Sequence, residues 1–337
     1  MKLKDVEFAP LCVPLSRRLE TLAAAAWIHL VAFGGITGCL LIAYLVLATR
    51  FWWLGLLYVA WIYIDRNTPS SGYTRFGFVR NWSWWYYYKN YFPVSLVKTH
   101  ELPADRSYLF ASYPHGVLCS GVFSNFATNA GPFREMFPGL KTFLITLNLH
   151  FSMPFTRELG IGLGLRESSE KSLVNILDGK KGNVAVLMVG GVSEAFKSFP
   201  GPIQIIINKR KGFVRVALKT GASLVPVFSF GETYVYGKGE ASPDSFWDKV
   251  LKLIKWKSGR LVPVGRGLFQ YSFGIVPRRH PIHTIVGKPI DVPKIENPTR
   301  EDIDKYHKIF VDELTKLFEE HKTKYSTNVE EQNLVLD

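Results

Sequence analysis

The chain has 337 residues, of which 47% are hydrophobic and only 20% are charged, and this composition excludes an intrinsically disordered protein. Its net charge of +13 suits a phosphate-bearing partner or an anionic membrane surface, and on charge alone it also fits nucleic acid. The three cysteines, Cys12, Cys39 and Cys119, have no CxxC spacing and therefore indicate neither a disulfide framework nor a zinc site. We expect a reducing, cytosol-facing location.

A long apolar segment comes first along the chain. Residues 21–48 contain no formally charged side chain, and these 28 residues exceed the roughly 20 that span a hydrocarbon core. The apolar character resumes over residues 51–64, which at 14 residues is short for a crossing by itself. Because Gly34, Gly35 and Gly38 lie near the middle, we predict a break there and a membrane hairpin. One long tilted helix is the alternative.

Basic residues flank this segment on both sides, which by the positive-inside tendency predicts that both ends are cytosolic. They are Lys2, Lys4, Arg17 and Arg18 before it and Arg66, Arg75, Arg80 and Lys89 after it. Residues 1–20 then form a cytosolic N-terminal segment, and residues 21–64 form the hairpin. A secretory signal peptide is disfavoured, because its apolar region would cover only about 7–15 residues.

A cluster of aromatic residues follows the apolar segment. Residues 80–93 contain eight aromatic side chains with basic residues at both ends, as expected at a lipid headgroup interface. We therefore predict that residues 65–106 form an interfacial aromatic segment. A cluster packed in the core is the alternative, although three consecutive tyrosines are hard to satisfy in a dry core.

From about Ser107 short apolar runs alternate with helical stretches. The predicted strands cover residues 108–112, 141–148, 183–189, 202–208 and 223–230, and the predicted helices cover residues 117–128, 169–177 and 212–219. This alternation predicts an α/β domain with a mainly parallel sheet over residues 107–323. Thr299 and Asp302 have the spacing of a capping box, so we expect a terminal amphipathic helix and then a polar tail over residues 324–337.

A histidine stands directly after the first strand of this domain, in the sequence Tyr113-Pro114-His115-Gly116. Open α/β sheets bind ligands at the carboxyl ends of their strands, so this position suits a catalytic base. A turn histidine bonded only to backbone is the alternative.

A second feature favours chemistry at the same edge of the sheet. Gly190 and Gly191 follow the strand at 183–189 and lead to Glu194, which this turn could place beside His115. A carboxylate there would fix the tautomer of the imidazole and stabilise its protonated form.

Basic residues gather where the helix at 212–219 begins, and a helix amino terminus favours phosphate. The candidates for a phosphate site are Lys209, Arg210, Lys211 and Arg215. A solvated basic helix end is the alternative. His280 and His283 lack neighbouring cysteines or clustered carboxylates, so we predict no metal site.

In these blocks the sequence resembles the type-2 diacylglycerol acyltransferase family, which includes the monoacylglycerol and wax-alcohol acyltransferases. The resemblance covers nearly the whole chain. It runs through the apolar segment, Tyr91-Phe-Pro93, Tyr113-Pro-His-Gly116, Gly190-Gly-Val-Ser-Glu194, Arg210-Lys-Gly-Phe-Val-Arg215, Val225-Pro-Val-Phe-Ser-Phe-Gly-Glu232 and Phe318-Glu-Glu-His-Lys322.

The resemblance implies an enzyme of the endoplasmic-reticulum membrane, found also at lipid droplets. Such an enzyme transfers a fatty acyl group from acyl-CoA to a neutral lipid hydroxyl, and we rank mono- and diacylglycerol above long-chain alcohols as acceptors in triacylglycerol synthesis. The implied partners are acyl-CoA, the acylglycerol and membrane lipids, with no nucleic acid and no cofactor beyond the acyl-CoA co-substrate. A homo-oligomer is compatible with this interpretation.

The resemblance also implies catalytic roles for two residues. His115 would take the proton of the acceptor hydroxyl as it attacks the thioester, and Glu194 would steady the imidazolium. The family motif is His-Pro-His-Gly, whereas Tyr113 stands here at the first histidine position. Tyr113 could donate a hydrogen bond in its place, or activity could be reduced.

Two other functions remain as alternatives. A serine hydrolase would use Ser193, which falls one residue short of G-x-S-x-G, with Asp291 or Asp248 and one of His280, His283 and His307. A non-catalytic lipid-binding membrane protein is the second, because of Tyr113. A lysophospholipid acyltransferase is disfavoured, because Ser120 replaces the aspartate expected five residues after the histidine.

Overall fold

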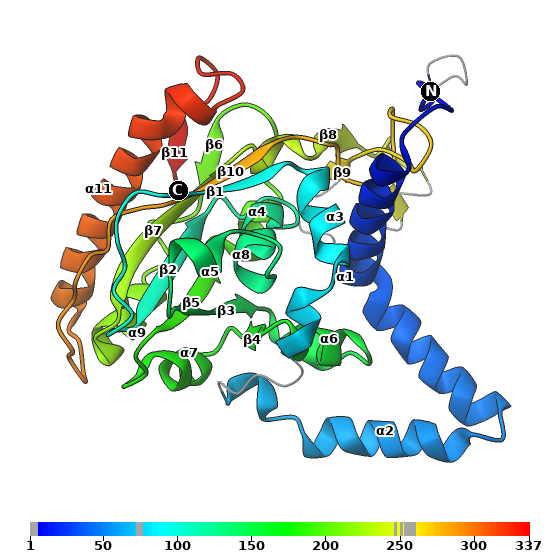
Figure 1. The fold of residues 1–337 in the computed structure, drawn as a ribbon, viewed down its shortest axis with the longest axis horizontal. Coiled ribbons are helices and arrows are strands. Elements are labelled where there is room, and N and C mark those ends of the chain that lie inside the picture. Colours follow the sequence, from blue (N-terminus) through cyan, green and yellow to red (C-terminus); the bar gives the residue numbers. More distant parts are fainter. Residues whose placement is uncertain (1–5, 72–76, 246–247, 250–251, 253–260) are drawn as a thin grey trace.

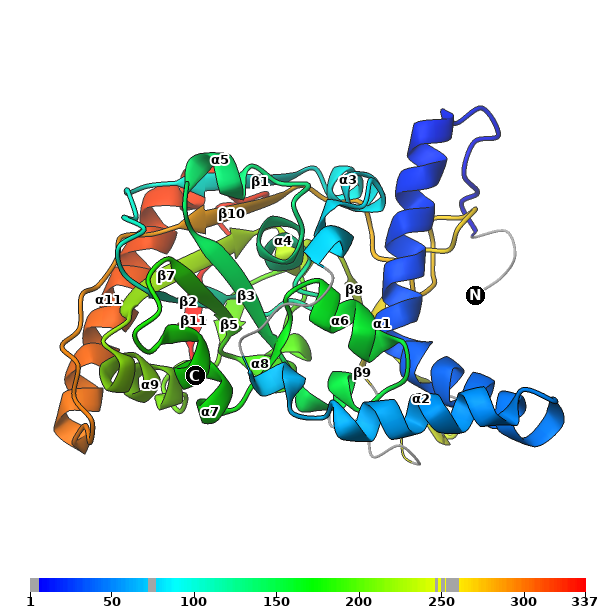
Figure 2. The same ribbon diagram turned by 60° about the horizontal axis from the view of Figure 1, so that its bottom comes forward.

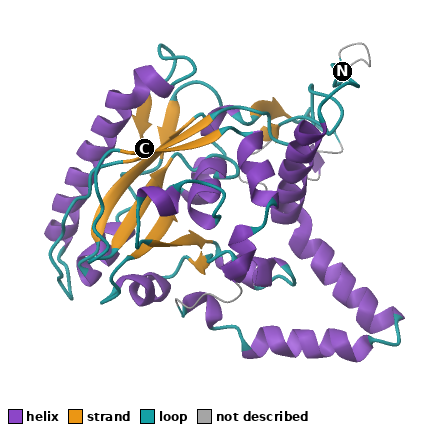
Figure 3. Ribbon diagram, in the orientation of Figure 1, coloured by secondary structure: helices purple, strands orange, loops and turns teal. Residues whose placement is uncertain are grey.

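A computed structural model describes residues 6–71, 77–245, 248–249, 252 and 261–337 (Figure 1). Lys2, Lys4 and Arg75 of the predicted basic flanks lie outside the described residues. The centre is a seven-stranded sheet in the order β1-β10-β7-β2-β5-β3-β4, drawn in orange in Figure 3. Within this sheet, as far as the structure describes it, only β10 and β7 pair in antiparallel fashion, so the predicted α/β domain with a mainly parallel sheet is confirmed. The strands are β1 (Val94–Lys98), β2 (Tyr108–Tyr113), β3 (Lys141–Thr146), β4 (Arg166–Glu167), β5 (Asn183–Met188), β7 (Ser223–Phe230) and β10 (Ile282–Val286).

Helices cover both faces of the sheet (Figures 1 and 2). One face packs against α7 (Glu170–Leu177), α9 (Gly212–Thr220) and α11 (Arg300–Tyr325). The other face packs against the start of α1 (Leu15–Ala48), α3 (Trp84–Tyr91), α4 (Ser120–Val122) with the following π-helical turn at Phe123–Ala127, and α5 (Phe133–Met136). The strands between these layers are buried on both faces, as in β2 and β7, which explains their continuous apolar runs.

Three predicted elements have different bounds in the structure. The helix predicted at 117–128 begins only at Ser120, because Cys119 has left-handed backbone with φ 53°. The strand predicted at 141–148 ends at Thr146 and continues as a 3₁₀ turn, Asn148–Phe151. The strand predicted at 202–208 is the short β6 (Ile203–Ile205), which lies outside the main sheet.

The C-terminal part of the chain confirms one prediction and corrects another. Thr299 accepts the Asp302 N–H and Asp302 accepts the Thr299 N–H, so α11 begins with the predicted capping box. The segment after Tyr325 is not merely a polar tail, because β11 (Leu334–Leu336) pairs in parallel with β6. Its two leucines pack against the core, and the sequence analysis missed this strand because it has only three apolar residues after a polar stretch.

The prediction of a helix break at the three glycines is wrong. Helix α1 runs unbroken through them and ends at Ala48, before α2 (Trp52–Ile64) begins. The glycines instead allow close packing: a Cβ at Gly35 would lie 2.8 Å from the Met153 side chain, and one at Gly38 would lie 2.8 Å from the Pro154 carbonyl oxygen. The absence of side chains thus serves the contact with the segment before α6 (Thr156–Gly162), and not a turn.

Helix α1 has two parts with different surroundings. Near its start Ala23, Ala24 and Trp27 are buried in the core, whereas Leu40 and Leu47 further along are 66% and 84% exposed. Helix α2 likewise exposes most of its apolar side chains, and Figures 1 and 2 show it extending beside α6 at the edge of the molecule. By length and composition α1 could cross a membrane, which makes the chain compatible with membrane association.

The aromatic segment is only partly a surface feature. Trp85, Tyr88, Tyr91 and Phe92 are buried in the core, while Trp82 and Tyr86 are about half exposed. The buried tyrosines are satisfied, since Tyr88 donates to the Ser120 hydroxyl at 3.3 Å and Tyr91 donates to the Pro277 carbonyl at 2.5 Å. The interfacial interpretation is therefore wrong for these four residues, because the surrounding loops supply the acceptors that a dry core was expected to lack.

The glycine contact gives a testable prediction. Gly38→Val should lower the free energy of unfolding by about 1–3 kcal/mol, because the new side chain meets a backbone carbonyl that cannot rotate away. The matched control is Ala43→Val, which adds a comparable bulk to an exposed position of the same helix. Thermal unfolding of the purified protein in detergent measures both variants, and equal melting temperatures would contradict the packing role.

Candidate active site

Three neighbouring parallel strands end at the same edge of the sheet and carry three titratable residues there. His115 follows β2, Glu194 follows β5 in the short helix α8 (Gly191–Ala195), and Glu232 follows β7. Because β2 pairs with both β5 and β7, these three residues come together at one edge. The predicted meeting of His115 and Glu194 at this edge is therefore confirmed, and Glu232 is an additional member.

The ring of His115 is held by its own loop. Its Nδ1 lies 2.8 Å from the Gly116 carbonyl oxygen, and because a carbonyl can only accept, Nδ1 carries the proton. Nε2 is then the basic nitrogen. Burial lowers the pKa of His115 below its ordinary value of 6.5, so the ring is neutral at physiological pH. The thiol of Cys119 lies 3.4 Å from Nδ1 and 3.7 Å from Nε2.

Glu194 contacts the backbone of His115 and not its ring. One carboxylate oxygen accepts the His115 N–H at 2.5 Å, and the other accepts the Ile206 N–H at 2.8 Å. The expectation that Glu194 steadies the imidazole is therefore wrong for this structure. The turn folds the carboxylate back over Gly190, where any Cβ would lie 1.9 Å from it, and Gly191 has the positive φ that the turn requires. Burial raises the pKa of Glu194 to about 7.

Glu232 is a second buried carboxylate that the sequence analysis did not single out. It accepts the N–H of Ser120 at 2.7 Å and the N–H of Gly121 at 3.0 Å. Its side chain also lies against Gly116, where a Cβ would come within 2.3 Å of it. Burial raises its pKa to about 7. The signal that could have identified it is its place at the end of a strand adjacent to β2.

Tyr113 points to the other side of the sheet. Its ring is fully buried at 6.4 Å from Phe310 of α11, among the residues that pack against α9 and α11. Among the described residues its hydroxyl has no hydrogen-bond partner. The suggestion that Tyr113 donates a hydrogen bond in place of the family histidine is therefore wrong. The adjoining Pro114 is buried and makes a cis peptide bond with Tyr113.

A cavity of about 900 Å³ opens at this edge of the sheet. His115 and Cys119 line it, together with Ser193 and Arg210 as further polar residues. Most of the remaining wall is apolar and includes Trp27, Leu30 and Val31 of α1. The cavity is large enough for an elongated apolar ligand. His115, whose Nε2 is the basic nitrogen, is part of its wall.

The predicted phosphate residues do not form one cluster. Arg210 lines the cavity, and Lys209 is exposed beside it. Lys211 instead pairs with Asp304 at 2.6 Å, and Arg215 pairs with Glu170 at 2.6 Å. Of the four candidates, only Arg210 is therefore placed to meet the charged part of a ligand in the cavity. The ion pairs of Lys211 and Arg215 form because α9 lies between α7 and α11.

The family of the chain follows from a comparison of its sequence with known proteins. The family model described as diacylglycerol acyltransferase matches residues 44–337. The chain belongs to the diacylglycerol acyltransferase family. It is 43% identical over 329 residues to 2-acylglycerol O-acyltransferase 1 of Bos taurus, covering 95% of this chain and 96% of that protein.

Other proteins extend the comparison. The chain is 42% identical over 320 residues to diacylglycerol O-acyltransferase 2 of Dictyostelium discoideum, covering 94% and 96% of the two proteins. The crystal structure of the 1-acyl-sn-glycerophosphate acyltransferase PlsC from Thermotoga maritima is similar over 92% of this chain and 97% of that one, with 14% identity and a TM-score of 0.43.

Membership of the diacylglycerol acyltransferase family makes the chain an acyltransferase, and the structure gives no support to a serine hydrolase. Ser193 lines the cavity, but the three proposed histidine partners form hydrogen bonds with other residues. His280 bonds to the Pro281 carbonyl, His283 to the Ser95 hydroxyl and His307 to the Ile207 carbonyl. Within the described residues no group of three or more His, Cys, Asp and Glu side chains could hold a metal ion.

The contacts of Glu194 predict what its replacement does. In Glu194→Gln the amide offers one acceptor oxygen for two backbone N–H groups, so we expect kcat to fall about 10–100-fold as the His115 loop shifts. The acid limb that belongs to His115 should keep its pKa, because the carboxylate contacts the backbone and not the ring. Glu101→Gln, at an exposed position, is the control. A clear downward shift of that limb in Glu194→Gln would show instead that Glu194 supports the imidazolium.

Proposed function

We propose that this acyltransferase transfers a fatty acyl group from acyl-CoA to diacylglycerol or monoacylglycerol, with His115 as the general base. The observation that carries the proposal is the neutral imidazole of His115 in the wall of a large, mainly apolar cavity. The names of the relatives support the acceptor class, since they are acyltransferases of 2-acylglycerol and of diacylglycerol.

The reaction follows from the tautomer of His115. As the acceptor oxygen attacks the thioester carbonyl, its proton passes to Nε2, while Nδ1–H remains bonded to the Gly116 carbonyl. The tetrahedral adduct collapses with cleavage of the carbon–sulfur bond, and the departing CoA thiolate takes the proton from the imidazolium. The products are an ester and CoA, the base is regenerated, and the sequence needs neither a covalent acyl-enzyme nor a cofactor.

The lining of the cavity supports separate places for the two substrates. Arg210 is the residue proposed to meet CoA phosphate, because guanidinium forms paired hydrogen bonds with phosphate oxygens. The acyl chains lie along the apolar wall toward Trp27, Leu30 and Val31 of α1. Since α1 continues into an exposed apolar stretch, we propose that lipid enters from a membrane, with the chain in the endoplasmic reticulum and at lipid droplets and both termini in the cytosol.

The direct test uses microsomes that lack their own neutral-lipid synthesis. Labelled oleoyl-CoA is supplied with monoacylglycerol, diacylglycerol or hexadecanol, and the labelled product names the acceptor. His115→Ala should lower the rate at least about a hundredfold without loss of the folded protein, because it removes the general base. A folded wild type that acylates none of the three acceptors would favour the non-catalytic lipid-binding alternative.

The pKa of His115 predicts the pH dependence. The neutral ring is the active form, and burial lowers its pKa, so the base stays available below the pH at which an exposed histidine is protonated. We expect the limb of log(kcat/KM) that belongs to His115 to have an apparent pKa below 6.5, which separates it from the proton uptake of Glu194 and Glu232 near pH 7. An acid limb above pH 7 would mean that a charged partner raises the pKa of the ring, contrary to its contacts.

A further inference from the structure

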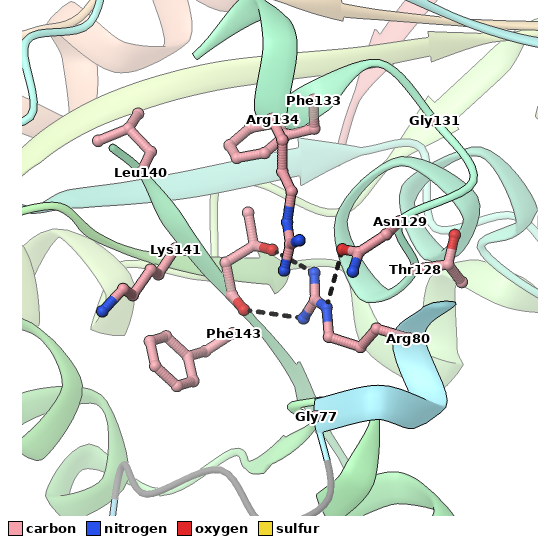
Figure 4. Close-up of a pocket in the computed structure, with 11 residues that line it drawn as sticks. Gly77, Arg80, Thr128, Asn129, Gly131, Phe133, Arg134, Leu140, Lys141 and Phe143 are labelled. Carbon is pink, nitrogen blue, oxygen red and sulfur yellow. Dashed lines mark hydrogen bonds between the residues drawn. The ribbon is translucent and has the colours of Figure 1, made fainter. Parts of the chain in front are cut away.

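The cavity of about 900 Å³ beside His115, the acyl cavity, is lined by residues at one end of β3. A second, smaller cavity lies at the opposite end of this strand. It has a volume of about 210 Å³, room for a few small groups at roughly 30 Å³ per water molecule. Lys141 and Phe143 at the start of β3 line it, together with Arg80 from the 3₁₀ helix η3 (Gly77–Asn81) and Arg134 from α5 (Figure 4). The residues that line the acyl cavity stand at the other end of the strand, from Leu144 to Leu147.

Arg80 forms a fixed positive charge beneath this cavity. All five of its N–H groups donate to oxygens of neutral groups, which are the carbonyls of Phe126, Thr142 and Leu163, the Thr142 hydroxyl and the Asn129 side chain. Within the part of the chain that the structure describes, its charge therefore has no carboxylate partner. Burial, Arg134 and Arg166 together lower the pKa of Arg80 to about 10, which records an environment that disfavours further positive charge.

Two more cations surround the same space. Arg134 is exposed and points into the cavity beside Arg80, while the Lys141 amine lies toward the rim (Figure 4). Neither side chain has a hydrogen-bond or ion-pair partner among the described residues, and no aspartate or glutamate lines the cavity. Three cations without a carboxylate repel one another, and an anion between them would relieve that repulsion. The amino-acid sequence had presented Arg80 only as part of a basic flank.

The surroundings of Arg80 place this cavity near the apolar helices. Leu163, whose carbonyl accepts from Arg80, directly follows α6. At its other end α6 meets the glycines of α1, and its Arg157 forms a buried pair with Asp65 just after α2 at 2.5 Å. Helix α6 therefore contacts Arg80 beneath the cavity at one end and the apolar helices α1 and α2 at the other.

We propose that this cavity binds a phosphate monoester, presented either as a lipid headgroup or as a soluble ion. A phosphate monoester carries close to two negative charges at neutral pH, and the movable guanidinium of Arg134 supplies paired donors to its oxygens. Arg80 and Lys141 contribute charge from below and from the rim. The site is separate from the Arg210 position at the acyl cavity and does not rest on the proposed acyl transfer.

The test measures binding to the full-length protein by its melting temperature. Inorganic phosphate should raise the melting temperature of the wild type in neutral detergent over chloride at equal ionic strength, because a ligand of the native state stabilises it. Arg134→Gln should weaken this binding at least about tenfold, since it removes a charge-assisted donor pair without touching the core. The control is Arg300→Gln, which changes an exposed arginine of α11 and should bind like the wild type.

A second arm separates the two sources of phosphate. The same proteins are placed in phosphatidylcholine nanodiscs with phosphatidic acid or with phosphatidylglycerol, whose phosphate is a diester. Stabilisation of the wild type by phosphatidic acid alone, lost in Arg134→Gln, supports a lipid headgroup, whereas stabilisation by inorganic phosphate alone supports a soluble ligand. The proposal is overturned if neither probe stabilises the wild type, or if Arg134→Gln responds as strongly as the wild type.

Discussion

The position of His115 depends on hydrogen bonds between the backbone of its loop and two buried carboxylates. Glu194 accepts the N–H of His115 itself, and Glu232 accepts the N–H groups of Ser120 and Gly121. Burying a carboxylate is costly, and charge-assisted bonds from two amides to each one offset that cost. Both acids bind backbone, so the imidazole has no charged partner within the described residues, and its burial keeps it neutral, which is the state a general base needs.

The same arrangement explains which parts of the fold and site could be predicted from the sequence. Strands β2, β5 and β7 are apolar throughout because they are buried on both faces, and parallel pairing then brings their carboxyl ends together. The apolar runs can be recognised in the sequence, and parallel pairing follows from the alternation of strands and helices. Together they predict that His115 and Glu194 lie at one edge of the sheet. Which atom of His115 the Glu194 carboxylate meets depends on a turn of a few residues, and spacing alone does not determine it.

Features that depend on distant neighbours were beyond the sequence. Gly34, Gly35 and Gly38 were predicted to break the helix because glycine weakens helices. In the structure they contact a segment more than a hundred residues further along the chain. Tyr88 and Tyr91 were predicted to lie at an interface because their hydroxyls need hydrogen-bond acceptors. In the structure the Ser120 hydroxyl and the Pro277 carbonyl are these acceptors. In both cases the residue type was informative, but its partner lay elsewhere in the chain.

Helix α1 joins two environments in one continuous element. Trp27 stacks on Phe123 with ring centroids 4.0 Å apart and also lines the acyl cavity, while the later turns of the helix expose leucines. Part of the cavity wall and the exposed apolar stretch therefore belong to the same continuous helix. A ligand moving along this helix would pass from one to the other without crossing a polar barrier made by α1.

The pairing of β11 with β6 ties the site to the order in which the chain is made. Ile206, which donates to Glu194, directly follows β6, and the one strand that pairs with β6 in the described part of the chain is β11, at residues 334–336. Those residues are synthesised after β6 and long after α1. The helix can therefore engage a bilayer during synthesis before the strand that supports the Glu194 contact has gained its partner β11.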